Sequence, residues 1–171
     1  GATDTGVTVD LRIAGAQSIS ATEGSDTLIG IENVTGSARD DSLTGNGGAN
    51  VLDGGGGNDT LKGWQGGDTL IGGAGFDTVI YIGSAVGVTV NLSAGAGIGG
   101  TAQGDRLSGI ERVRGSAFDD MLIGDGFANV LNGGTGDDTL SGWGGNDALN
   151  GGIGKDRLDG GIGRDHLVGW L

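Results

Sequence analysis

The stretch Gly54-Gly55-Gly56-Gly57-Asn58-Asp59-Thr60-Leu61-Lys62 contains the pattern that decides the fold. Numbered from its first glycine, it has glycine at positions 1, 2 and 4, aspartate at position 6 and leucine at position 8. The residues around position 8 have the apolar centre and polar flanks of a very short strand whose leucine points inward. The glycine-rich residues before them favour a turn with backbone conformations that are closed to most side chains. One unit therefore predicts one turn and one strand.

Ten further units keep this nine-residue frame. They start at Gly36, Gly45, Gly63, Gly72, Gly115, Gly124, Gly133, Gly142, Gly151 and Gly160. Position 8 is leucine or valine in every unit, and position 6 is aspartate except at Asn50 and Asn129. A fixed period of this kind is the signature of a solenoid in which each unit stacks on its neighbours.

A longer repeat contains the short one, because residues 30–64 are identical to residues 109–143 at 24 of 35 positions. We divide the chain into two pseudo-repeats. The first, 1–80, has linker coils over 1–35 and a nonapeptide block over 36–80; the second, 81–171, has linker coils over 81–114, a block over 115–168 and the start of a further unit at 169–171.

The linker coils carry degenerate versions of the same units. Asp26-Thr27-Leu28 and Asp105-Arg106-Leu107 repeat the end of a nonapeptide, and short strand-like pieces follow them at 31–34 and 110–113. We expect these pieces to join the same stack. Between Leu92 and Asp105 the second copy is two residues shorter than the first and dense in glycine, so we expect a loop there.

The composition excludes several classes of protein. The chain has 171 residues, of which 43 are glycine and none is proline or cysteine, so it is neither collagen nor a disulfide-rich domain. The formal net charge of −13 opposes binding to a phosphate backbone, so we expect no nucleic acid partner. No apolar run reaches the ~18 residues of a membrane span, so we expect no membrane insertion. With one histidine and no Gly-x-Ser-x-Gly motif, the sequence has no pattern typical of catalysis, and we expect no enzyme.

The turns have the chemistry of a calcium site. Glycine-rich turns leave peptide carbonyls free to converge, and position 6 adds a carboxylate. Oxygen ligands without imidazole or thiolate favour Ca²⁺ over zinc, copper or iron, and Mg²⁺ fits less well because it demands octahedral geometry. Ordering nine residues costs more conformational free energy than burying one leucine returns, while the aspartates would stack in like-charged rows. We therefore expect the chain to need calcium in order to fold.

The units Gly72–Ile80 and Gly151–Asp159 resemble the hemolysin-type calcium-binding nonapeptide of RTX proteins. The resemblance implies an all-β fold, a right-handed parallel β-roll (a β-solenoid) with stacked calcium-binding turns, in which each nonapeptide is half a coil. It also implies that calcium lies between turns two units apart. The earlier turn would supply the carbonyls of positions 2 and 4 and its carboxylate, and the later turn the carbonyls of positions 1 and 3 and its own carboxylate.

Pairing the turns in this way implies about seven calcium ions. Two sites keep the complete motif, those that pair Asp59 with Asp77 and Asp138 with Asp156. In further pairs Ser37, Ser116 or Trp143 replaces the position 2 glycine, which leaves the carbonyl ligand in place. The pairs that begin at Asn50 and Asn129 should bind more weakly, because a neutral amide is a poorer ligand. The implied metal ligands are Asp41, Asn50, Gly54, Gly55, Gly56, Gly57, Asp59, Gly63, Gln65, Asp68, Gly72, Ala74, Asp77, Asp120, Asn129, Gly133, Gly134, Thr135, Gly136, Asp138, Gly142, Gly144, Gly145, Asp147, Gly151, Ile153, Asp156, Gly160, Ile162 and Asp165.

The resemblance also implies a role outside the cell. RTX proteins are bacterial, and type I secretion would bring this one to the medium or the cell surface. The two near-copies favour a structural spacer or stalk of an adhesin, joined to further RTX repeats of its parent chain. Two alternatives stay open: a self-assembling extracellular filament or surface-layer component that associates through the ends of the solenoid, and a non-catalytic C-terminal appendage of a secreted enzyme.

The remaining distinctive side chains favour no second function. Trp64, Trp143 and Trp170 share position 2, which raises the hypothesis of a glycan-stacking surface. Trp143 and Trp170 are three units apart and are expected on opposite sides of the roll, so plain surface packing is the favoured interpretation. His166 is expected on a strand surface. Positions 3 and 5 vary too much between units for an ice-binding array.

Overall fold

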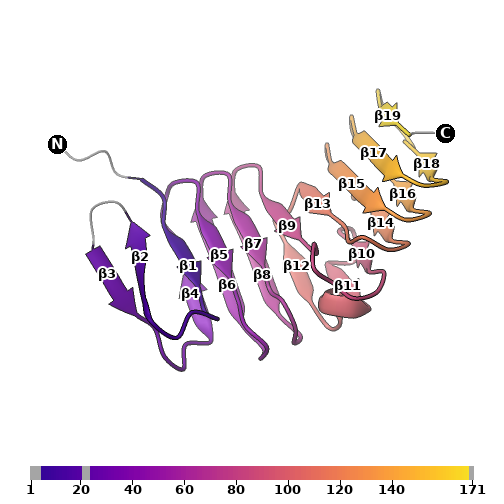
Figure 1. Cartoon of the computed structure of the whole chain (residues 1–171). Helices are drawn as coiled ribbons and strands as arrows, with labels where there is room; N and C mark the ends of the chain where they lie inside the picture. The colour runs from indigo at the N-terminus through magenta and orange to yellow at the C-terminus, as the bar shows by residue number, and fades with distance from the viewer. Residues whose placement is uncertain (1–4, 21–23, 170–171) are drawn as a thin grey trace.

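The computed structural model of the chain describes residues 5–20 and 24–169. Nearly all of its regular structure is short strand, and the strands stack in two rows from one end of the molecule to the other (Figure 1). Successive half-coils contribute strands to the two rows in turn. The predicted parallel β-roll is therefore confirmed. No helix in the described residues is long and apolar enough to cross a membrane.

One row is an eight-stranded sheet in which all neighbours run parallel. In spatial order its strands are β1 (Thr8–Asp10), β5 (Ser42–Thr44), β7 (Thr60–Lys62), β9 (Thr78–Ile80), β13 (Arg112–Arg114), β15 (Val130–Thr135), β17 (Ala148–Ile153) and β19 (His166–Val168).

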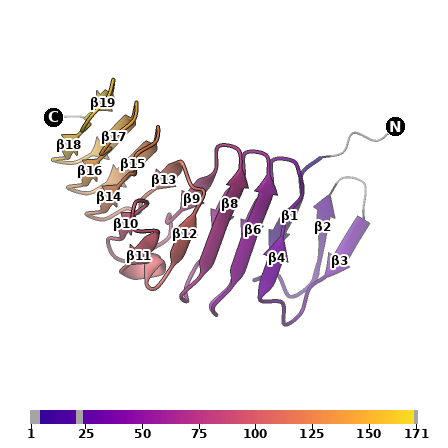
Figure 2. The same ribbon diagram turned by 180° about the vertical axis from the view of Figure 1, so that it is seen from behind.

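The other row is a nine-stranded sheet, which faces the viewer in Figure 2. In spatial order its strands are β4 (Asn33–Thr35), β6 (Val51–Gly56), β8 (Thr69–Ala74), β12 (Arg106–Ser108), β11 (Ala96–Ile98), β10 (Thr89–Asn91), β14 (Met121–Ile123), β16 (Thr139–Ser141) and β18 (Arg157–Asp159). Its neighbours are parallel except where β11 lies antiparallel to β10 and β12.

Units two apart lie side by side and in register. Leu43 of β5 pairs with Leu61 of β7, and Leu61 pairs with Val79 of β9. In the other sheet Leu52 pairs with Leu70. This pairing at a separation of 18 residues shows that each nonapeptide is half a coil, as the resemblance implied.

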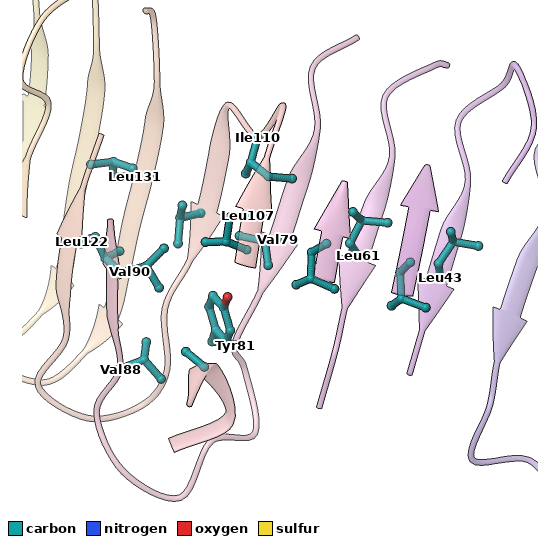
Figure 3. Packing of buried hydrophobic residues seen from close by; sticks show 14 of the residues in the cluster. Leu43, Leu61, Val79, Tyr81, Val88, Val90, Leu107, Ile110, Leu122 and Leu131 are labelled. Carbon is teal, nitrogen blue, oxygen red and sulfur yellow. The ribbon is translucent and has the colours of Figure 1, made fainter. Parts of the chain in front are cut away.

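The core lies between the two sheets and consists of the position 8 side chains of the blocks together with apolar side chains of the linkers (Figure 3). Leu43, Leu61 and Val79 are fully buried there, and Tyr81 joins them where the two nonapeptide blocks meet. The last two units depart from the prediction that every position 8 residue is buried. Leu158 is only partly buried and Leu167 is 43% exposed, because β18 and β19 have a neighbouring strand on one side only.

Both sheets continue through the boundary between the two pseudo-repeats. β12 pairs with β8, and β13 pairs with β9, so the second linker lies directly on the end of the first block. Because the first block has an odd number of half-coils, equivalent strands of the two pseudo-repeats lie in opposite sheets. β1 belongs to the eight-stranded sheet, whereas its counterpart β10 belongs to the nine-stranded sheet.

The segment between Leu92 and Asp105 is not a simple loop, so that prediction was wrong. It forms β11 and a short 3-10 helix, η1 (Gly100–Ala102). The Gly97 N–H donates to the carbonyl of Asp105 at 3.0 Å, and Leu107 N–H donates to the carbonyl of Gly95 at 2.9 Å. These hydrogen bonds place β11 inside the nine-stranded sheet, between β10 and β12, in place of leaving the glycine-rich segment in solvent.

The corresponding part of the first linker is arranged differently. β2 (Ala16–Ser20) and β3 (Gly24–Thr27) form an antiparallel pair of their own, so among the described residues β3 does not join either row. Its counterpart β12 instead pairs in parallel with β8. The prediction that this piece joins the stack is wrong for β3, whereas β4, β12 and β13 do join it.

Candidate metal centre

The position 6 carboxylates form two ladders, one along each side of the roll. In every rung, the backbone N–H of one position 6 residue donates to the Oδ1 atom of the position 6 aspartate two units later. The distances are 2.8 Å from Asp41 to Asp59, 2.7 Å from Asp59 to Asp77, 2.8 Å from Asn50 to Asp68, 2.8 Å from Asp120 to Asp138, 3.0 Å from Asp138 to Asp156, 2.8 Å from Asn129 to Asp147 and 3.0 Å from Asp147 to Asp165. All of the predicted pairs are thus brought together.

The second carboxylate oxygen of most rungs is buried without a hydrogen-bond partner in the described structure. These atoms are the Oδ2 atoms of Asp59, Asp68, Asp77, Asp138, Asp147 and Asp156. A buried carboxylate oxygen that lacks a donor loses its hydration without replacement, which is unfavourable unless a cation is present. The turns therefore fit an oxygen-binding cation such as Ca²⁺, and this orphaned oxygen is the atom in each aspartate that would hold it.

The position 1 glycines shape the space around these orphaned oxygens. A Cβ built on Gly54 would meet Asp59 Oδ2 and would lie 2.6 Å from the carbonyl oxygen of Gly72, which is position 1 two units later. A Cβ on Gly133 would likewise meet Asp138 Oδ2 and lie 2.7 Å from the carbonyl oxygen of Gly151. The missing side chain thus lets one carboxylate oxygen and one carbonyl oxygen approach each other, as a shared cation would require.

Position 2 has a left-handed backbone in every unit where it is glycine, which explains the second glycine of the motif; Ser37, Asn46, Ser116 and Asp125, in the first two turns of each block, do not adopt it. Gly55 has φ of 91° and Gly134 has φ of 113°. Trp64 and Trp143 adopt the same conformation, with φ of 73° and 76°. Trp143 is 59% exposed, whereas the Trp64 ring lies beneath the cations of Arg12 and Lys62, 4.6 and 4.5 Å from its centroid.

Several position 3 carbonyls also hold adjacent coils together. Ala74 accepts a hydrogen bond from Gly57 N–H at 2.9 Å, and Ile153 accepts one from Gly136 N–H at 3.0 Å. A carbonyl oxygen has two lone pairs, so these contacts leave one for a cation.

The negative charge of the ladders is unfavourable without a cation. Burial, and to a smaller extent the neighbouring carboxylates of Asp120 and Asp156, raise the pKa of Asp138 to about 6. Burial likewise raises the pKa values of Asp59, Asp68, Asp77 and Asp147 above their ordinary range. A bound divalent cation would reverse this effect, because it favours the ionised form of each carboxylate that it contacts.

The sequence profile of the RTX calcium-binding nonapeptide repeat matches the chain in four copies, over residues 29–61, 44–79, 123–158 and 150–171, which together cover more than half of it. The chain belongs to the RTX family. This RTX module binds calcium, and the family's repeat is a structural domain and not a catalytic one. No curated protein matches the chain.

The first turn of each block in this RTX module has a feature that sequence reasoning missed. Ser37 donates its N–H to Asp41 Oδ2 at 2.5 Å and its hydroxyl to Asp41 Oδ1 at 3.0 Å. Ser116 does the same for Asp120, at 2.5 and 2.8 Å. Serine at position 2 therefore satisfies both oxygens of these two carboxylates within the turn, so they are less available to a cation than the orphaned oxygens of later turns.

Three further residues were missed at the junction between the blocks, namely Tyr81, Asp105 and Glu111. Asp105 continues one ladder, since Asp68 N–H donates to its Oδ1 atom at 2.9 Å, and Glu111 continues the other, since Asp77 N–H donates to its Oε2 atom at 2.8 Å. The signal was an acidic residue two positions before Leu107 and Val113. The Tyr81 hydroxyl donates to Asp105 Oδ2 at 3.1 Å, so this oxygen is satisfied without a metal.

The Asp105 rung gives a pH-dependent prediction. Burial raises the pKa of Asp105 to about 6, so the folded chain holds this proton more tightly than the unfolded chain. The raised pKa of Asp105 contributes at most about 3 kcal/mol to the free energy of unfolding. This contribution is complete below about pH 4 and is lost as the pH rises through about 6. Asp105→Asn removes the charge, keeps an oxygen that can accept the Asp68 N–H, and offers the Tyr81 hydroxyl oxygen an amide N–H to accept. In saturating calcium, the melting temperature of Asp105→Asn should exceed that of the wild type by a difference that grows between pH 4 and 6. Above pH 7 this difference should stay constant.

Asp159→Asn is the control for this comparison, because Asp159 lies exposed on β18 outside every turn. Its melting temperature should follow the wild type at every pH. If the Asp105→Asn and Asp159→Asn curves coincide, the buried rung does not contribute to the pH dependence.

Proposed function

We propose that this RTX module is a structural spacer of a secreted bacterial protein, folded by calcium and carrying no catalytic site. The observation that supports it best is the set of buried, partnerless Oδ2 atoms repeated at 18-residue intervals along both sides of the roll. They give each of the two nonapeptide blocks its own series of candidate cation sites, which suits a load-bearing role better than a single regulatory site.

In this proposal each cation lies between turns two units apart. The pairs Asp59 with Asp77 and Asp138 with Asp156 form the complete sites, with the carbonyls of the same turns as further ligands. About seven ions would be bound in the two blocks. The bound calcium supplies binding free energy that only the folded chain can use, and it neutralises the stacked carboxylates. The sites that contain Ser37, Ser116, Asn50 or Asn129 would be the weaker ones.

The spacer assignment rests on how the pseudo-repeats join. Residues 1–80 and 81–171 share both sheets, and the second linker pairs with the end of the first block through β12 and β13. Adding another pseudo-repeat in the same way would lengthen the roll without creating a hinge. We therefore propose that this module is one part of a longer tandem array of RTX repeats in an adhesin.

A location outside the cell follows from the chemistry of calcium and from the family, whose repeats are typically extracellular. Site affinities near those of extracellular calcium modules, about 10⁻⁴ to 10⁻³ M, would keep the chain unfolded in the cytosol. An unfolded chain suits type I secretion, and folding would then follow in the calcium-rich medium.

The decisive measurement is the free calcium concentration at which the chain folds, fixed with calcium buffers and followed by circular dichroism. We expect a midpoint of about 0.1 to 1 mM. Folding at nanomolar free calcium would contradict the proposal.

Sedimentation velocity at the same calcium concentrations separates the spacer from the self-assembling filament. A spacer should remain an elongated monomer, whereas growth into polymers on addition of calcium would favour the filament. An appendage of a secreted enzyme would also be monomeric, and the length and composition of the parent gene distinguish it from an adhesin spacer.

A further inference from the structure

We infer that the junction between the two nonapeptide blocks holds a calcium site of its own, built from Asp77 of the first block and from Gly109 and Glu111 of the linker. This site falls outside the nonapeptide pattern, because no unit of the nine-residue frame starts at Gly109. The inference rests on the proposed calcium-dependent folding and adds one ion to it.

Glu111 occupies position 6 of a shortened turn. The carbonyl of Asp77 accepts a hydrogen bond from Arg112 N–H at 2.9 Å, just as the carbonyl of Asp59 accepts one from Thr78 N–H at 2.8 Å. Arg112 pairs with Thr78 in the sheet, so Glu111 is in register with Asp77. Its Oε2 atom accepts the Asp77 N–H at 2.8 Å, which is the role of Oδ1 in the regular rungs.

Gly109 supplies the carbonyl that position 1 supplies in a regular turn. A Cβ built on Gly72 would meet the carbonyl oxygen of Gly109 and would lie 2.6 Å from Asp77 Oδ2. This is the same pair of oxygens that surrounds Gly54, where the carbonyl comes from Gly72 and the carboxylate from Asp59. The linker turn is three residues shorter than a nonapeptide turn, and glutamate, which is one methylene longer than aspartate, bridges the difference.

The carboxylate of Asp77 has the burial and the unpaired oxygen that favour a bound cation at this place. Asp77 is 0% exposed, and its Oδ2 atom has no hydrogen-bond partner in the described structure. Arg112 does not neutralise it, because its guanidinium lies over the Phe76 ring, 5.0 Å from the centroid. A buried oxygen beside a carbonyl and a second carboxylate is the donor set of the regular turns, so a Ca²⁺ ion is the ligand of matching chemistry.

The opposite side of the same junction shows what a rung without metal looks like. There Asp105 takes the position 6 place, and the Tyr81 hydroxyl donates to the Oδ2 atom that would otherwise be free. No hydroxyl takes this role for Asp77. The two sides of the junction therefore differ, with a tyrosine in one rung and a calcium ion in the other.

The test is the number of calcium ions bound by the whole chain, counted by native mass spectrometry and by calorimetric titration. Glu111→Gln keeps an oxygen that can accept the Asp77 N–H but removes the charge, so we expect it to bind one ion fewer than the wild type. Glu32→Gln is the matched control. Glu32 lies in the same Gly-Ile-Glu sequence at 30–32, and its side chain is exposed, so the ion count of Glu32→Gln should equal that of the wild type.

An unchanged ion count in Glu111→Gln would overturn the junction site while leaving calcium-dependent folding intact. Failure of the proposed function would instead be seen in the wild type, as a chain that folds without calcium. If Glu111→Gln does not fold, a crystal structure of the wild type grown in calcium decides the question. An ion bound to Asp77 Oδ2 and Glu111 supports the site, and its absence from a crystal with calcium at the regular turns rejects it.

Discussion

In excess EGTA the chain is expected to lose its β-sheet circular dichroism and become unfolded, and millimolar Ca²⁺ should restore the folded spectrum. The core is a thin layer of mostly aliphatic side chains between two sheets of strands three to six residues long, which returns too little free energy to order the glycine-rich turns. The buried carboxylates oppose folding further, because their unpaired oxygens lose hydration and repel one another. Only a ligand that binds the folded turns can reverse both effects.

Magnesium is the control for this experiment. At equal concentration it should restore much less structure, because it requires a tight octahedral shell and gives up its waters reluctantly. A chain that keeps its full spectrum in EGTA, with no change on addition of calcium, would show that the metal is dispensable for folding.

Asp59→Ala and Asp138→Ala are expected to be among the most damaging single substitutions in the regular turns. The Asp59 carboxylate accepts the Asp41 N–H, and the backbone N–H of Asp59 donates to Asp77, so this residue belongs to the rungs below and above it. Asp138 has the same place between Asp120 and Asp156. Each variant should therefore weaken two calcium sites and raise the calcium concentration at the folding midpoint by about tenfold or more, which corresponds to about 1.4 kcal/mol.

Strand aspartates supply the matched controls for these two variants. Asp53→Ala in β6 and Asp159→Ala in β18 remove the same side chain at position 9, outside every turn. They should leave the bound calcium and the folding midpoint close to those of the wild type. Equal effects of Asp53→Ala and Asp59→Ala would show that the nine-residue register of the ligands is wrong.

The nine-residue frame predicted most of the fold, because every unit repeats the same physical requirements. Leucine at position 8 predicted the core, and its pairing at a separation of 18 residues is confirmed by Leu43, Leu61 and Val79. The pairing of position 6 residues two units apart was implied by the resemblance to the RTX nonapeptide, and the structure places all of these pairs in adjacent rungs. Their role as calcium ligands stays a prediction.

The junction could not be predicted, because its contacts do not follow the period. Asp68 contacts Asp105 across 37 residues and Asp77 contacts Glu111 across 34, whereas every regular rung spans 18. Insertion of β10, β11 and η1 separates these partners in the chain and leaves them adjacent in space. The hydrogen bonds of Ser37 and Ser116 were missed for another reason: a serine in place of glycine was considered only for its carbonyl, although its hydroxyl also binds the carboxylate of its own turn.

The exchange of sheets between corresponding strands of the two pseudo-repeats has a consequence for any longer array. β1 lies in one sheet and its counterpart β10 in the other, so the second copy relates to the first by a half-turn about the roll axis combined with a translation. This operation is a two-fold screw and not a simple translation. The turns of Trp64 and Trp143 accordingly lie on opposite sides of the roll, because one leads from β7 to β8 and the other from β16 to β17. In a longer array joined in this way, a feature that one copy presents on one side of the roll is presented on the opposite side by the next copy, so outward-facing turns such as these alternate between the two sides.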